Sequence, residues 1–139
     1  MKPGYEILDH PADLGIEATG ETLAEAFEQA ASGLISVILD PSSIDSLETI
    51  QITVNSSDYH QLLVRWLSEI LYLYDGRRFA PREFKVQSLT ETSLTAVVQG
   101  ERFSVEKHDT RLDVKAVTYH QLSIEENESG AKVRVYLDI

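Results

Sequence analysis

The sequence contains no cysteine among its 139 residues. It therefore lacks both a disulfide framework and the thiolate ligands of structural zinc and iron–sulfur sites. Any metal ion in this protein would be held by oxygen atoms, with imidazole nitrogen as the other available ligand. The absence of cysteine also fits a reducing cytoplasm.

Long apolar runs are missing as well. The N-terminal residues do not form the apolar stretch of a signal peptide, and no segment approaches the roughly 20 apolar residues that would span a bilayer. We therefore expect a soluble, cytoplasmic protein that does not bind membranes.

Basic residues are scarce, and those present are unevenly distributed. The chain has 12 Lys plus Arg against 23 Asp plus Glu, for a net charge of −11. This charge repels phosphate backbones and argues against strong direct binding of nucleic acid. Residues 1–64 contain 11 acids and Lys2 as their single base, so the first half would attract a cation or a basic protein surface. The alternative is a solvated acidic surface without a partner.

Patterns that would indicate an enzyme are also lacking. There is no Gly-x-Ser-x-Gly elbow, the seven glycines form no phosphate-binding loop, and the four histidines are scattered. We therefore assign no catalytic residue and favour a non-enzymatic role.

Apolar periodicity predicts two helices and several strands. Capping boxes at Thr22 and Asp58 begin helices that end at Asp40-Pro41 and at Asp75-Gly76, each with one apolar stripe for packing on a sheet. Trp66 belongs to the second stripe and is expected in the core. Strands are predicted at 5–8, 14–19, 47–54, 84–89, 94–99, 114–124 and 131–139, all within a single domain spanning 1–139.

The basic residues that do occur include a cluster after the second helix, made of Arg77, Arg78, Arg82 and Lys85. Such a cluster would either neutralise acids on the same surface or meet an acidic partner. We favour the internal explanation.

Acidic residues gather in the turn between the first two strands and again at the end of the sequence. Asp9, His10 and Asp13 lie in the turn, while Asp138 and the Ile139 carboxylate lie at the end. Such an oxygen-rich set suits calcium or magnesium better than zinc. Spacing alone does not bring the two segments together, so two unrelated exposed acidic segments are the alternative.

Three motifs carry a resemblance to a known family. They are Asp9-His10-Pro11-Ala12-Asp13-Leu14-Gly15 followed by 20–27, then Lys115-Ala116-Val117-Thr118-Tyr119-His120, and finally Asp138-Ile139. In this combination the sequence resembles the archease family from end to end. The resemblance implies an α+β fold, an archease-like single domain with a mixed, largely antiparallel β-sheet and two amphipathic helices packed on it. Pro11 departs from the threonine most common there.

The resemblance also implies a function. Archeases are accessory proteins of the GTP-dependent, RtcB-type tRNA-splicing RNA ligase, and they promote guanylylation and multiple turnover of the ligase. The family's metal site falls on Asp13, Asp138 and Ile139, with calcium as the expected cofactor. Asp9 and His10 would shape the turn, and Lys115 would lie near the acids. The alternatives are a chaperone-like modulator of a tRNA-modifying methyltransferase and a small metal-dependent hydrolase.

Overall fold

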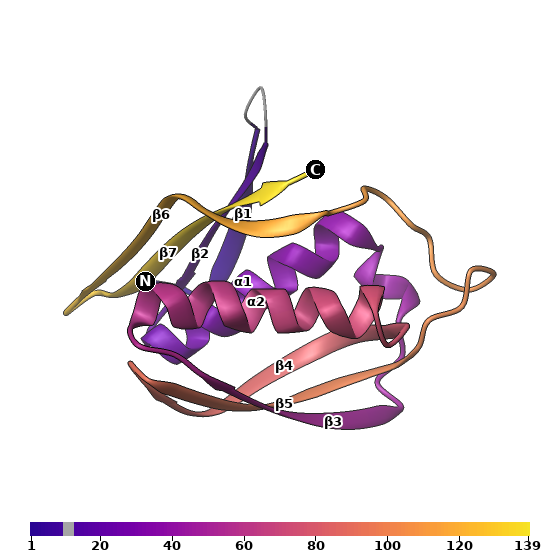
Figure 1. Ribbon diagram of the computed structural model, residues 1–139, viewed down its shortest axis with the longest axis horizontal. Coiled ribbons are helices and arrows are strands. Elements are labelled where there is room, and N and C mark those ends of the chain that lie inside the picture. The colour runs from indigo at the N-terminus through magenta and orange to yellow at the C-terminus, as the bar shows by residue number, and fades with distance from the viewer. Residues whose placement is uncertain (10–12) are drawn as a thin grey trace.

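The protein consists of two antiparallel sheets with two helices between them (Figure 1). The computed structural model describes residues 1–9 and 13–139, apart from the side chain of Asp9. One sheet has the strand order β1-β2-β7-β6, and the other has the order β3-β5-β4. The elements in chain order are β1 (Gly4–Asp9), β2 (Leu14–Gly20), α1 (Leu23–Ile38), the 3-10 turn η1 (Pro41–Ser43), β3 (Glu48–Asn55), α2 (Tyr59–Asp75), β4 (Phe79–Thr90), β5 (Ser93–Arg102), β6 (Ala116–Asn127) and β7 (Gly130–Asp138).

The expected α+β class with two helices and largely antiparallel strands is confirmed. Every pairing between the described strands is antiparallel. In place of the single mixed sheet that the resemblance implied, the strands form two antiparallel sheets. Periodicity could not show this division, because it identifies the buried face of a strand but not its neighbour in the sheet. No described helix combines the length and apolar character that crossing a membrane requires.

Both helices begin where the capping pattern predicts. The hydroxyl of Thr22 accepts a hydrogen bond from the backbone N–H of Glu25 at 3.1 Å, while the Glu25 carboxylate accepts one from Glu21 N–H at 2.7 Å. Asp58 accepts the N–H of Gln61 at 2.8 Å in the second helix. These bonds satisfy amides of the first turn that have no partner within the helix.

The position of the helices between two sheets explains how thoroughly they are buried. Trp66 on α2 is fully buried, and its Nε1–H donates to the carbonyl oxygen of Phe27 on α1 at 2.9 Å. Its ring also meets Phe84 of β4 edge-on, with centroids 6.3 Å apart. The assignment of Trp66 to the core is confirmed. This side chain joins both helices to the three-stranded sheet.

The end of α2 differs from a simple glycine cap. Gly76 follows the helix as expected, but it has right-handed backbone angles, with φ −94°. A Cβ there would lie 2.3 Å from Cε1 of Tyr72, so glycine is needed to make room for that ring. Left-handed angles occur instead two residues later, at Arg78, with φ 54°, a conformation that a non-glycine residue rarely adopts.

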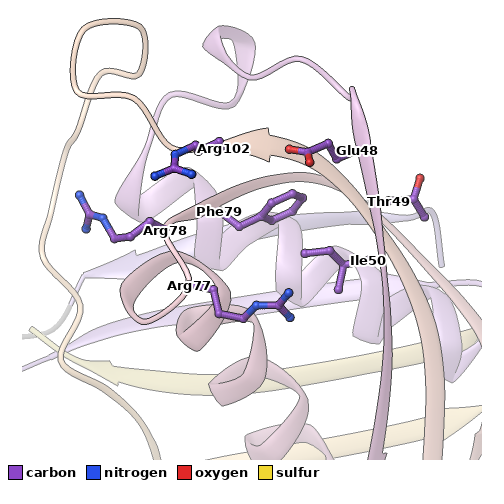
Figure 2. Close-up of a pocket in the computed structure, with 7 residues that line it drawn as sticks. All are labelled: Glu48, Thr49, Ile50, Arg77, Arg78, Phe79 and Arg102. Carbon is purple, nitrogen blue, oxygen red and sulfur yellow. The ribbon is translucent and has the colours of Figure 1, made fainter.

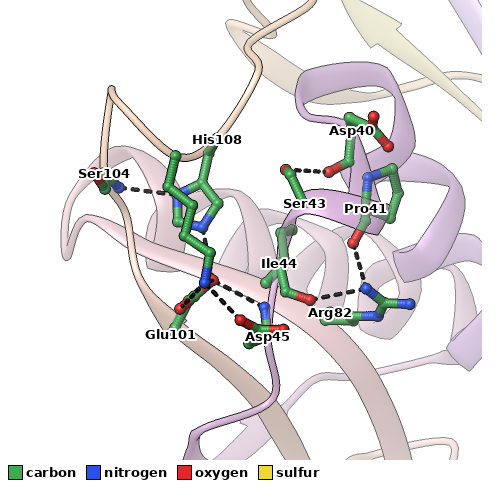
Figure 3. A network of polar contacts seen from close by, with 10 residues as sticks. Asp40, Pro41, Ser43, Ile44, Asp45, Arg82, Glu101, Ser104 and His108 are labelled. Carbon is green, nitrogen blue, oxygen red and sulfur yellow. Dashed lines mark hydrogen bonds and ion pairs between the residues drawn. The ribbon is translucent and has the colours of Figure 1, made fainter.

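A buried polar network holds the long connection between β5 and β6 (Figure 3). Glu101 and His108 are buried, and His108 Nε2 lies 2.8 Å from a Glu101 carboxylate oxygen. Since His108 Nδ1 accepts from the N–H of Ser104, Nε2 carries the proton and donates to Glu101. Lys107 bridges Glu101 and Asp45, and the hydrogen bond from Lys107 is the main cause that lowers the pKa of Glu101 to about 2.

Replacing Trp66 by Phe should destabilise the fold by about 1–3 kcal/mol, because the smaller ring loses core contacts and the hydrogen bond to Phe27. Urea denaturation followed by far-UV circular dichroism measures this loss. Tyr72→Phe is the matched control, since Tyr72 is an exposed aromatic residue on the same helix, and its effect should stay within about 0.5 kcal/mol. Equal losses in the two variants would contradict the role given to Trp66.

Glu101 should make the stability of the protein depend on acid. Its pKa is about 2 in the fold against an ordinary value of 4.5, so its contribution is complete above pH 4.5 and is lost as the pH falls toward 2. Glu101→Gln should therefore flatten the free energy of unfolding between pH 4.5 and 2. Denaturation curves across this range test the expectation. A variant with the wild-type slope would show that other carboxylates cause the acid sensitivity.

Candidate functional site

The candidate site lies at the end of the four-stranded sheet where β2 begins and β7 ends. Leu14, the first residue of β2, pairs with Leu137 near the end of β7. Asp13 directly precedes Leu14, and Asp138 directly follows Leu137. The antiparallel register therefore brings these two acids to the same end of the sheet. Figure 1 shows the C-terminus at this end of β7.

Two further candidates join the same end. The backbone N–H of Lys115 donates to the carbonyl oxygen of Asp138 at 2.8 Å, just before β6 begins. Ile139 follows Asp138 and is 39% exposed. The backbone of Asp9 pairs with Leu14 in β1, whereas the side chain of Asp9 and the whole of His10 lie outside the described residues. The structure thus gathers Asp13, Asp138, Ile139 and Lys115.

The alternation of side chains along the strands determines which face carries the acids. Leu14, Ile16 and Ala18 of β2 are buried toward the helices, as are the odd-numbered apolar residues of β7. Asp138 is exposed on the opposite face of β7, as its pattern predicted. Continuing the alternation of β2 back to Asp13 places that residue on the same outer face.

An aromatic pair lies on this face beside the acids, and the sequence analysis missed it. A Cβ on Gly15 would approach Cε1 of Tyr136 to 2.7 Å, so glycine leaves the space that the tyrosine ring fills. Tyr136 is consequently 7% exposed. The ring of His120 meets it at a steep angle, with centroids 6.3 Å apart. The periodicity of β7 predicts on which face of the sheet Tyr136 lies, but it does not predict that His120 contacts its ring.

An irregularity in β6 positions His120. Thr118 of β6 pairs with Tyr136 of β7, and the next paired residues are Ser123 and Arg134. The segment of β6 between these two pairs is longer than the matching segment of β7, so β6 forms a bulge there. The hydroxyl of Thr118 donates to the carbonyl of Tyr136 at 2.9 Å and accepts the N–H of His120 at 3.2 Å. Within this bulge Gln121 has φ 52°. The sequence predicted an unbroken strand here, since no glycine or proline marks the bulge.

Charge is distributed unevenly along the outer face. Toward the middle of the sheet, Glu17 binds Arg134 at 2.6 Å and lies 3.9 Å from Lys132. The hydrogen bond from Arg134 to Glu17 raises the pKa of the arginine. The charged side chains in the middle of this face therefore neutralise one another, whereas Asp13 and Asp138 lie at its end.

The available ligand atoms fit a hard cation. Two carboxylates and the backbone oxygens of Ile139 are oxygen ligands of the kind that calcium and magnesium bind. Among the residues that the structure describes, no group of three or more His, Cys, Asp or Glu side chains is arranged to hold a metal ion. A site here would therefore depend on backbone oxygen as well as on Asp13 and Asp138.

Comparison with known proteins decides the family. Residues 5–139 match the model of the Archease protein family. The chain belongs to the archease family. It is 40% identical to protein archease of Methanosarcina barkeri over 139 residues, covering 97% of this chain and 95% of that relative. It is 39% identical to protein archease of Sulfolobus acidocaldarius, covering 97% and 98% of the two chains.

A solved structure agrees with the archease assignment. The solution structure of Methanobacterium thermoautotrophicum protein 1598 superimposes with a TM-score of 0.80 at 33% identity, covering 98% of this chain and 99% of that one. The resemblance found in the three motifs is thereby confirmed, and so is the archease fold.

Thr118→Val should loosen the bulge, because valine keeps the β-branched shape but makes neither hydrogen bond of Thr118. We expect a loss of about 1 kcal/mol and faster hydrogen exchange at the amide of His120. Exchange followed by NMR measures both the site and the size of the effect. Thr53→Val, which makes the same change at an exposed position of β3, is the control. Unchanged exchange at His120 would show that the bulge does not depend on this hydroxyl.

Proposed function

We propose that this archease-family chain is an accessory protein of a GTP-dependent, RtcB-type tRNA-splicing RNA ligase, whose guanylylation and multiple turnover it promotes. Membership of the family supports this role. The observation that carries it in the structure is the β2–β7 register, which sets the partly buried Asp13 and the exposed Asp138 at one end of the sheet. A contact surface formed there would contain residues from both ends of the sequence.

The electrostatics of that end suit an enzyme that binds nucleotides. The active site of such an enzyme is positively charged, because it receives phosphate groups. The net charge of −11 would speed the approach of this chain to a positive surface, and the acids at the end of the sheet would orient it. The ligase's own residues would perform the chemistry, and this chain would act by contact in the cytoplasm.

Asp13, Asp138 and the backbone oxygens of Ile139 would hold a divalent cation, for which calcium is the best candidate. When bound, the ion would neutralise the two carboxylates and fix them relative to each other. Lys115 is tied to Asp138 through the backbone and would balance charge beside the ion. Asp9 and His10 would frame the turn that leads to Asp13.

Exchanging either carboxylate for an amide should abolish activation of the ligase. Asp13→Asn and Asp138→Asn keep the size of each side chain but remove its charge and most of its affinity for calcium. We expect each variant to lower the rate of covalent guanylylation of the ligase, measured with labelled GTP, by at least about tenfold relative to the wild type. Calorimetric titration with calcium should show a parallel loss of affinity.

Glu91→Gln supplies the matched control, since it makes the same carboxylate-to-amide change at an exposed turn of the other sheet. It should activate the ligase like the wild type. Circular dichroism should give the same fold for all three variants. Full activation by both aspartate variants would refute the acidic end as the contact site, and activation without any calcium binding would refute the metal part alone.

A further inference from the structure

In the part of the chain that the structure describes, six of the twelve lysines and arginines form hydrogen bonds or ion pairs. These side chains bind carboxylates or backbone carbonyl oxygens, and they are Arg65, Arg82, Lys107, Arg111, Lys132 and Arg134. Of the basic cluster, Arg82 donates to the backbone carbonyl oxygens of Pro41 and Ile44 and not to the acids that the internal interpretation expected. Arg77 and Arg78 form no ion pair with a described residue.

Three of the remaining cations line one pocket (Figure 2). Arg77 and Arg78 follow the end of α2, and Arg102 is the last residue of β5, where it pairs with Phe79 of β4. The pocket has a volume of about 250 Å³ and is lined by Glu48, Thr49, Ile50, Arg77, Arg78, Phe79 and Arg102. Figure 2 shows the arginines around the buried ring of Phe79, with β3 across from them.

The acids near the pocket leave the arginines available. Glu101 precedes Arg102 in the strand, but its carboxylate is bound to Lys107 and His108. Glu48 lines the pocket and forms no ion pair with a described arginine. The residues that line the pocket include three arginines and one carboxylate, so the lining carries a net positive charge on a protein whose net charge is −11.

Two aromatic rings outside the pocket lining hold Arg78 in a fixed orientation. The Cζ of Arg78 lies 4.6 Å from the ring centroid of Phe103 and 5.8 Å from that of Tyr74. Its carbonyl accepts the N–H of Phe103 at 2.8 Å. A guanidinium stacked in this way keeps the N–H groups of its edge free for a ligand, and stacking reduces the entropy lost when the ligand binds.

A simpler explanation accounts for part of this arrangement. Cations near the C-terminal end of a helix are favoured by the partial negative charge of its last carbonyls. That effect explains neither Arg102, which belongs to a strand, nor the left-handed backbone of Arg78, where glycine would be free of strain. Strained residues of this kind are concentrated at binding sites.

We propose that Arg77, Arg78 and Arg102 form a binding site for the phosphate group of a compact phosphorylated molecule. The planar guanidinium matches phosphate oxygens in pairs. The pocket is smaller than the roughly 300–1,000 Å³ of sites for larger organic ligands. The net charge of −11 disfavours a long polyanion such as RNA, so we assign the site to a compact anion. This inference does not depend on the proposed function.

Titration with inorganic pyrophosphate, followed by amide NMR at constant ionic strength, tests the site on the wild-type chain. We expect saturable shifts confined to residues 77–79 and 102–103. Arg102→Gln should weaken binding at least about tenfold, and Glu48→Gln should tighten it severalfold by removing the opposing charge. Arg78→Gly should also weaken binding without lowering the melting temperature, because glycine tolerates the left-handed backbone.

The controls separate a site from a general effect of charge. Lys85→Gln and Glu91→Gln make the same charge changes at exposed positions outside the pocket, and both should bind pyrophosphate within twofold of the wild type. Absence of saturable shifts, or equal effects of Lys85→Gln and Arg102→Gln, would overturn the proposal. Tighter binding of an oligoribonucleotide without terminal phosphate at the same amides would overturn the assignment to a compact anion.

Discussion

The antiparallel pairing of β2 with β7 joins segments from opposite ends of the sequence, and the candidate site depends on it. The pairing runs from Leu14 opposite Leu137 to Gly20 opposite Ala131. Because side chains alternate with period two, a slip of one residue would turn the buried face of one of the two strands to solvent. The apolar contacts with the helices therefore fix the register. The same register brings Asp13 and Asp138 together.

Local features of the fold could be predicted because they depend on neighbouring residues. The caps at Thr22 and Asp58, the core position of Trp66 and the hairpin between β4 and β5 all follow from short-range chemistry or from periodicity. The division into two sheets could not be predicted, because every strand shows one apolar face whichever sheet contains it. The left-handed backbone was also missed, since its residue is Arg78 rather than Gly76.

The candidate site was predictable only in part, because it too depends on which strands are neighbours in the sheet. Residue types and the resemblance to archeases identified Asp13, Asp138 and Lys115, but their proximity is a property of the strand pairing. His120 belongs to the second archease motif, but nothing in the sequence indicated its contact with Tyr136, because that contact requires both the space above Gly15 and a bulge in β6. Bulges redirect side chains without a fixed sequence pattern. A reader of the sequence has no means to place His120 over the neighbouring strand.

The acids at the end of the four-stranded sheet and the arginines of the pocket would act on their partners over different distances. The net charge of −11 acts on approaching partners over about a Debye length, roughly 8 Å at physiological ionic strength. The arginine pocket is small, and the net negative charge of the protein lowers its attraction for anions at a distance. Its affinity must therefore come from direct contact between guanidinium groups and ligand oxygens. Added salt would weaken the approach of a basic partner to Asp13 and Asp138. The same salt would also screen the repulsion between the acidic surface and an anion entering the pocket, so the two sites should differ in their salt dependence.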